Sequence, residues 1–148
     1  MAFPESIRTA CLERDRYTCR ACGFRDKRAV QADHGKPESL GGPDTLENAQ
    51  CLCGVCNNLK GNTNTGILPQ RPRPCGFGDA VEVEANRQAF EHLLTTIRAA
   101  EYAAILADAR QWKSDGVRGL TIRKRINGRL NRKPDATGGQ TDEILALL

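Results

Sequence analysis

The stretch QADHGKPESLGGPDTLENAQCLCGVCNNLKG, residues 31–61, decides the fold of this chain. It contains one of only two histidines and three of the seven cysteines among 148 residues. Apolar and polar residues alternate over 29–34, and 48–53 is a second strand candidate beyond a turn-rich connection. Residues 54–62 favour a short helix that Gly61 ends. The stretch therefore predicts a β-hairpin followed directly by a helix.

Four cysteines form two C-x-x-C pairs, Cys19 with Cys22 and Cys53 with Cys56. This spacing predicts a structural zinc site closed by four thiolates, with no open position for a substrate. A C-x-C alternative, with Cys51 in place of Cys53, fits the turn less well. The spare cysteines are expected to be small buried hydrophobic residues. They are Cys11, Cys51 and Cys75.

Length and composition allow one small domain with an appendage. Hydrophobic residues make up 39% of the chain and aromatic residues only 5%, so a thin core that needs a metal staple is expected. The N-terminal MAFPESIRTA is unlike a signal peptide, and no 18-residue apolar stretch could span a membrane. We therefore expect a cytoplasmic protein whose reduced, paired cysteines bind metal rather than form disulfides.

Outside the hairpin, the sequence predicts a short helix at 4–17 and a long helix at 81–112, ended by 114–116. Residues 63–80 are rich in Pro and Gly and predict a linker or an irregular wrap. The long helix could cover the zinc core or form a homodimer with a second copy. Its apolar stripe recurs at spacings of three and four. The stripe consists of Phe90, Leu93, Leu94, Ile97, Ala100 and Ala104.

The 81–148 extension contains a basic segment, 118–133, with seven Lys and Arg residues and no acid. This concentration of positive charge favours a polyanion partner over a merely solubilising face. Residues 134–140 are expected to be loose, and Thr141 is expected to cap a last short helix. His92 faces away from the apolar stripe and is expected to be exposed.

The chemistry-bearing elements follow one another as C-x-x-C, Asp-His, Gly-Gly, Glu-Asn and C-x-x-C-Asn-x-x-Lys. Their order and spacing, over roughly residues 14–62, resemble the HNH endonuclease family, whose core is the ββα-metal fold. The resemblance implies an α+β chain in which 1–62 form a small ββα-metal core with a zinc knuckle. A linker and a mainly helical C-terminal extension would follow. It also implies hydrolysis of DNA phosphodiester bonds, by nicking or by double-strand cutting.

Roles for individual residues also follow from the resemblance. His34 would be the general base that activates water. Asp33 and Asn57 would bind a catalytic divalent cation such as Mg²⁺, which prefers oxygen ligands. Asn48 would orient the histidine or brace the loop between the strands, and Lys60 would lie near a phosphate.

Adjacent strand residues face opposite sides of a sheet, so Asp33 and His34 can share a site only where the strand ends or twists. Gly35 and Pro37 favour such an end.

In the basic segment, four side chains are expected to contact phosphates without reading bases. They are Arg123, Lys124, Arg125 and Arg129.

A different class of function remains open at the level of sequence. A catalytically silent zinc module that binds nucleic acid or a protein partner could keep all four cysteines. It would have little need for Asp33, His34, Asn48 and Asn57 together. An RNA substrate is also compatible with the same chemistry, and the setting, whether phage, mobile element or restriction and defence system, is open.

Overall fold

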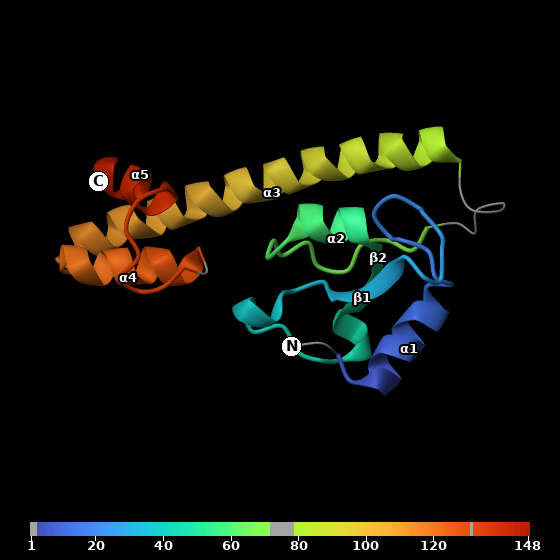
Figure 1. Ribbon diagram of the computed structural model, residues 1–148. Coiled ribbons are helices and arrows are strands. Elements are labelled where there is room, and N and C mark those ends of the chain that lie inside the picture. Colours follow the sequence, from blue (N-terminus) through green and yellow to red (C-terminus); the bar gives the residue numbers. More distant parts are fainter. Residues whose placement is uncertain (1–2, 72–78, 131) are drawn as a thin grey trace. The chain divides into compact units, whose positions relative to one another are not determined.

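The computed structural model describes residues 3–71, 79–130 and 132–148 (Figure 1). The chain divides into two compact units, Met1–Ile97 and Arg98–Leu148, with the boundary inside one continuous helix. The helices and strands are α1 Glu5–Arg14, β1 Val30–His34, β2 Ala49–Cys53, α2 Gly54–Lys60, α3 Ala80–Ser114, α4 Gly119–Arg129 and α5 Gln140–Ala146. Two short 3₁₀ helices, η1 Glu38–Leu40 and η2 Leu46–Asn48, lie between the strands.

The centre of unit 1 is the predicted β-hairpin and helix. Strands β1 and β2 pair antiparallel, from Val30 opposite Cys53 to His34 opposite Ala49. Helix α2 begins at the residue after β2 and ends at Gly61, whose N–H donates to the Asn57 carbonyl over 3.0 Å. Helix α1 packs beside both strands. The expected α+β class, with a ββα core and C-terminal helices, is confirmed.

The connection between the strands depends on a close backbone approach. A Cβ atom on Gly42 would lie 1.8 Å from the Lys36 carbonyl oxygen, so only glycine fits there. The Gly42 N–H donates to the Pro37 carbonyl over 2.9 Å, which closes the turn. At the strand end, the Gly35 N–H donates to the Asn48 carbonyl over 2.9 Å. The turn residues expected in this connection therefore have defined backbone roles.

A buried carboxylate joins α1, β2 and the cysteine knuckle, which is the loop from Thr18 to Arg25 that carries Cys19 and Cys22. Asp15 is 2% exposed; it accepts hydrogen bonds from Arg14 at 2.7 Å and from Arg20 at 2.6 and 2.7 Å. It also accepts the backbone N–H of Cys51 at 2.9 Å. Burial alone would raise the pKa of this carboxyl, but the hydrogen bonds from Arg20, Arg14 and Cys51 hold it below its usual value.

The segment 63–71 has no regular secondary structure and packs against unit 1. This matches the irregular wrap, one of the two alternatives that the sequence offered. The buried Gln50 accepts the Leu68 N–H through Oε1 over 2.9 Å. Arg20 donates to the Leu68 carbonyl over 2.8 Å, and Arg71 donates to the Ala21 carbonyl over 2.5 Å. These bonds attach the wrap to the knuckle and to β2. The expected linker residues 72–78 lie outside the described part of the chain.

Helix α3 contributes to two separate cores. Before Ile97 it buries Val83, Phe90 and Leu94 in the core of unit 1, against the cysteine knuckle and β2. Past the boundary, Ile105 and Ala109 are buried in unit 2 instead. The apolar stripe predicted on this helix is therefore only partly buried. Its exposed members are Leu93, Ala100 and Ala104.

Unit 2 packs the end of α3 with α4 and α5. Its buried residues are Ile105, Ala109, Ile122, Ile126 and Ile144. Asn127 is fully buried; its Nδ2 donates to the carbonyls of Pro134 at 3.1 Å and Ala136 at 3.0 Å. Residues 134–139 therefore lack regular structure but are held in place, and are not loose as expected.

The cap expected at Thr141 was wrong. Helix α5 begins at Gln140 after an N-cap at Gly139. The buried Thr141 hydroxyl donates to Asn127 Oδ1 over 2.6 Å and accepts a hydrogen bond from Arg132 Nη1 over 2.7 Å.

None of the helices in the described part of the chain combines the length and apolar character needed to cross a bilayer.

Replacing Asp15 by Asn should lower the free energy of unfolding by about 3 kcal/mol, because two guanidinium groups lose their buried counter-charge. Since the folded pKa of Asp15 is depressed, its contribution is present at neutral pH and lost as the pH falls through that value. Urea unfolding of zinc-loaded protein at pH 7 measures the change. The control is Asp26→Asn, at a carboxylate whose partner Arg28 is exposed; an equal loss in both variants would contradict the buried role of Asp15.

Candidate active site and metal centre

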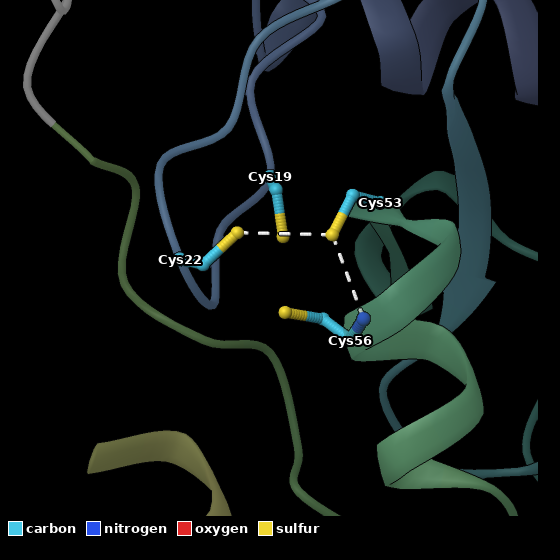
Figure 2. A group of neighbouring side chains, drawn as sticks. All are labelled: Cys19, Cys22, Cys53 and Cys56. Carbon is cyan, nitrogen blue, oxygen red and sulfur yellow. Dashed lines mark hydrogen bonds between the residues drawn. The ribbon is translucent and has the colours of Figure 1, made fainter. Parts of the chain in front are cut away.

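Four buried cysteines converge where the knuckle meets the start of α2 (Figure 2). Cys19 and Cys22 lie on a loop whose ends meet through an antiparallel bridge between Thr18 and Arg25. Cys53 ends β2, and Cys56 lies in the first turn of α2. Their four sulfur atoms all lie within 4.8 Å of one another.

The geometry and chemistry of this cluster fit a structural zinc ion. A tetrahedral ion with Zn–S bonds of about 2.3 Å holds its sulfurs roughly 3.8 Å apart. Cys22 Sγ and Cys53 Sγ are 3.7 Å apart. The backbone N–H groups of Phe24 and Cys56 each point at a sulfur over 3.5 Å. Hydrogen bonding with Cys19 lowers the pKa of Cys22 to about 7 and also lowers that of Cys53, whereas hydrogen bonding within the cluster raises the pKa of Cys19 and Cys56. Binding of a zinc ion would require all four thiols to lose their protons.

The first half of α3 adds polar contacts to the cluster. Arg87 Nη2 lies 3.6 Å from Cys53 Sγ, and Asn86 Nδ2 donates to the Cys22 carbonyl over 3.0 Å. Four thiolates and Zn²⁺ carry a net negative charge, which the Arg87 guanidinium offsets in part. Such contacts around the ligands orient them and tune the metal. Helix α3 is therefore part of the metal centre although it supplies no ligand.

Two of the spare cysteines are buried, as expected. Burial raises the pKa of the Cys11 thiol to about 11 and also raises that of Cys51. Both thiols are therefore protonated at neutral pH and pack as small apolar groups. The cluster uses Cys53 and not Cys51, which excludes the C-x-C alternative. Cys75 lies outside the described residues.

A pocket of about 300 Å³ opens at the end of β1. It is lined by Asp33, His34, Pro37, Glu38, Ser39, Lys60, Gly61 and Asn62. Because β1 ends at His34, the strict alternation of the strand ends there, and both Asp33 and His34 reach the same space. The pocket thus brings together the carboxylate, the imidazole and the lysine that the sequence singled out. Asn57, half-buried on α2, is not among its lining residues.

The ring of His34 is held on two sides. It stacks on Phe3, with ring centroids 3.8 Å apart and an interplanar angle of 17°. Its Nε2 atom lies 2.6 Å from Asp44 Oδ1. The histidine side chain is 12% exposed, so the ring is accessible over a small area only.

Asn48 fastens the loop between the strands. Its Oδ1 accepts the Lys36 N–H over 2.9 Å, and its Nδ2 donates to the carbonyls of Lys36 and Pro43, each over 3.0 Å. The side chain therefore bridges both sides of the connection. This is the bracing geometry that the resemblance implied, and Asn48 makes no direct hydrogen bond to His34.

Lys60 lines the pocket and is buried against Asp33. Its side chain is 1% exposed, and Nζ lies 3.0 Å from Asp33 Oδ2. It forms an ion pair with the carboxylate at the pocket, and its expected position near a phosphate stays a prediction. A buried pair of this kind fixes the direction of Asp33, because each charge is costly to leave alone.

Sequence reasoning missed several residues at this site. Phe3 and Asp44 contact His34, and Glu38, Ser39 and Asn62 line the pocket. Asp44 follows a Gly-Gly-Pro turn, so it had the pattern of an ordinary turn residue. Asn62 directly follows the glycine that ends α2, which is the one signal that it lies near the hairpin.

The basic segment is largely folded into unit 2. Arg123 pairs with Asp142 at 2.7 Å, and Arg129 pairs with Asp108 at 2.6 Å. Arg125 lies 5.1 Å from the ring centroid of Trp112, while Lys124 is exposed. Two of the four expected phosphate contacts therefore already have acidic partners. In unit 1, His92 is exposed, as expected.

Residues 19–63 match the family model described as HNH endonuclease. This segment is an HNH endonuclease domain. The match begins at the first cysteine of the cluster and includes the hairpin, α2 and the pocket residues from Asp33 to Asn62. It covers less than half of the chain, and α1 and α3 to α5 lie outside it. Neither a curated protein nor a solved structure gives a significant match.

Replacing Cys22 by Ser should remove bound zinc from the HNH domain and abolish its cooperative unfolding, because a thin core depends on the metal. Cys51→Ala, at a buried cysteine outside the cluster, is the matched control and should keep one zinc per chain. Metal content by mass spectrometry and thermal unfolding measure both. Zinc retained by the first variant, or lost from the second, would contradict the assignment of ligands.

Replacing Lys60 by Met should destabilise the protein by about 3 kcal/mol, because Asp33 would lose its buried counter-charge. Added Mn²⁺ should restore part of the loss, since a divalent cation can take the place of the ammonium group. Thermal unfolding of the zinc-loaded variant with and without Mn²⁺ tests this. Lys36→Met removes an exposed lysine nearby and should change little; a Lys60 variant as stable as this control would refute the pairing.

Proposed function

We propose that the chain is a metal-dependent endonuclease that hydrolyses DNA phosphodiester bonds with His34 as the general base. The observation that carries the proposal is the shared pocket of Asp33 and His34 inside an HNH domain. A carboxylate and an imidazole beside a buried lysine make a site that can bind a cation, accept a proton and attract a phosphate. A purely structural zinc module has no use for this combination.

His34 is suited to accept a proton from water. Imidazole is the side chain whose unperturbed pKa lies nearest neutrality, which favours proton transfer at physiological pH. The ring is fixed by Phe3 and Asp44, so little orientational freedom is lost on the way to the transition state. In the proposed reaction the water loses a proton to His34 and attacks phosphorus, and the phosphodiester oxygen opposite the water leaves.

The pocket chemistry fits a hard divalent cation. Asp33 supplies a carboxylate, and the lining residues Glu38, Ser39 and Asn62 also carry oxygen atoms. We assign Asp33 as the principal ligand, with Asn57 as the second ligand implied by the family resemblance. When bound, the cation would supply positive charge for the phosphate oxygens on which negative charge grows.

Lys60 is assigned a supporting role at the pocket. Its ammonium group holds Asp33 Oδ2 from the buried side, 3.0 Å away. The carboxylate therefore keeps one orientation whether or not a cation is present. The positive charge of Lys60 also makes the pocket less repulsive to a phosphate, although the group itself is covered.

Binding of DNA outside the pocket is assigned to exposed basic side chains of α4. Lys124 is exposed and Arg125 packs over Trp112, so both can meet a phosphate without breaking an ion pair. Arg123 and Arg129 would first have to leave Asp142 and Asp108.

Of the two roles expected for the long helix, covering the zinc core is favoured over forming a homodimer. The reason is that α3 already buries Val83, Phe90 and Leu94 in the core of unit 1.

Plasmid cleavage tests the proposal. Wild type, His34→Ala and His92→Ala are compared in zinc-loaded form with EDTA, Mg²⁺, Mn²⁺ or Ni²⁺. Loss of the base should reduce cleavage by about 10²–10⁴-fold. The control variant His92→Ala lacks the second histidine of the chain, which is exposed, and it should cleave like wild type.

Conversion of supercoiled plasmid to the nicked or linear form shows the strand outcome directly. Wild-type activity that survives in His34→Ala would contradict the assigned base. If no metal supports cleavage of DNA or of RNA by folded wild type, the result contradicts the proposal and favours the alternative of a catalytically silent zinc module that binds nucleic acid or a protein partner.

A further inference from the structure

The loop between the strands places a second carboxylate against the histidine of the HNH domain. Asp44 Oδ1 lies 2.6 Å from His34 Nε2, a short distance for a charge-assisted hydrogen bond. Asp44 is not among the residues that line the pocket, whereas His34 is. The carboxylate therefore contacts the ring away from the space where a cation or phosphate would bind. This placement suits a residue that acts on the histidine and not on the substrate.

The Asn48 side chain fixes the loop that carries Asp44 through three hydrogen bonds, one of them next to Asp44. Asn48 Nδ2 donates to the carbonyl of Pro43, the residue directly before Asp44. Asn48 also makes two hydrogen bonds to the backbone of Lys36. Its Oδ1 accepts the Lys36 N–H, and its Nδ2 donates to the Lys36 carbonyl. Asn48 thus reaches His34 indirectly, through the loop and the Asp44 carboxylate.

The ring of His34 has few remaining ways to turn. Phe3 covers one face, with centroids 3.8 Å apart, and Asp44 holds the Nε2 edge. A carboxylate accepts but does not donate, so Nε2 must carry the proton in this contact. The other ring nitrogen, Nδ1, is then the one without a proton in the neutral imidazole.

We propose that Asp44 is a positioning residue for His34, which fixes the ring with its proton on Nε2 and leaves Nδ1 as the nitrogen that accepts a proton. The proposal rests on the proposed function, because positioning matters for catalysis only if His34 is the base. Its structural part, the Nε2–H to Asp44 hydrogen bond, stands independently of any cleavage. The two parts can therefore be tested separately.

Nitrogen NMR spectroscopy tests the structural part. The chain has only two histidines, and His92→Gln assigns their ring signals. In ¹⁵N-labelled, zinc-loaded wild type at the pH of the cleavage assay, His34 should give one proton-bearing and one bare ring nitrogen. In Asp44→Ala, both nitrogens should shift toward the exchange-averaged values of the exposed His92. Asp44→Asn keeps an oxygen acceptor and should give an intermediate spectrum.

Cleavage kinetics test the catalytic part. Asp44→Ala should lower kcat by about 10- to 100-fold, which is less than the loss of the base itself, with little change in KM. Asp44→Asn should recover part of the rate. The matched control is Glu47→Gln, which removes an exposed carboxylate from the same loop and should leave both the spectrum and kcat unchanged.

The outcomes separate the two hypotheses. An unchanged His34 spectrum in Asp44→Ala overturns the proposal, as does an altered spectrum with an unchanged kcat. If wild type cleaves nothing, the proposed function fails, while the spectrum still decides whether Asp44 holds His34. The expected pair of results, a released ring and a lower kcat with zinc retained, supports both.

Discussion

The meeting of four cysteine sulfurs is the constraint on which the HNH domain depends. A two-stranded hairpin is marginal by itself, and this one has a seven-residue helix behind it and few aromatic residues around it. The cluster joins the knuckle at Cys19 and Cys22 to the junction of β2 and α2, and α3 covers it from outside the matched segment. Binding one ion in this cluster would therefore hold together several elements whose own packing is too small to keep them folded.

The pocket follows from where the hairpin stops. A longer strand would have placed Asp33 and His34 on opposite faces, but β1 ends at His34 and the chain turns at Gly35. The site contains a compromise between charges. Lys60 neutralises Asp33 from the buried side, so the carboxylate is oriented in advance, and a divalent cation bound as proposed would have to share it. The same arrangement would make the affinity for the cation moderate.

The ββα core and its metal ligands could be predicted from sequence, because C-x-x-C spacing, strand alternation and the Gly61 stop are local signals. The burial of Lys60 could not, since it depends on the partner that packing brings to its ammonium group. Asp44 and Phe3 lacked any local mark of function. The apolar stripe on α3 could be predicted but its exposed members could not, because periodicity indicates which residues share a helix face and not which of them a core covers. Thr141 had the sequence pattern of a helix cap, but its hydroxyl donates a hydrogen bond to the buried Asn127 instead.

The most direct test of the central claim is selective Mn²⁺ broadening of the histidine ring signals in zinc-loaded protein. Mn²⁺ is paramagnetic, so a substoichiometric amount broadens only the nuclei close to where it binds. If Asp33 holds a divalent cation in the pocket it shares with His34, the His34 signals should broaden first, while those of the exposed His92 stay sharp. Asp33→Asn should abolish the difference. Equal broadening of both histidines, or none at His34, would contradict a cation site at this pocket.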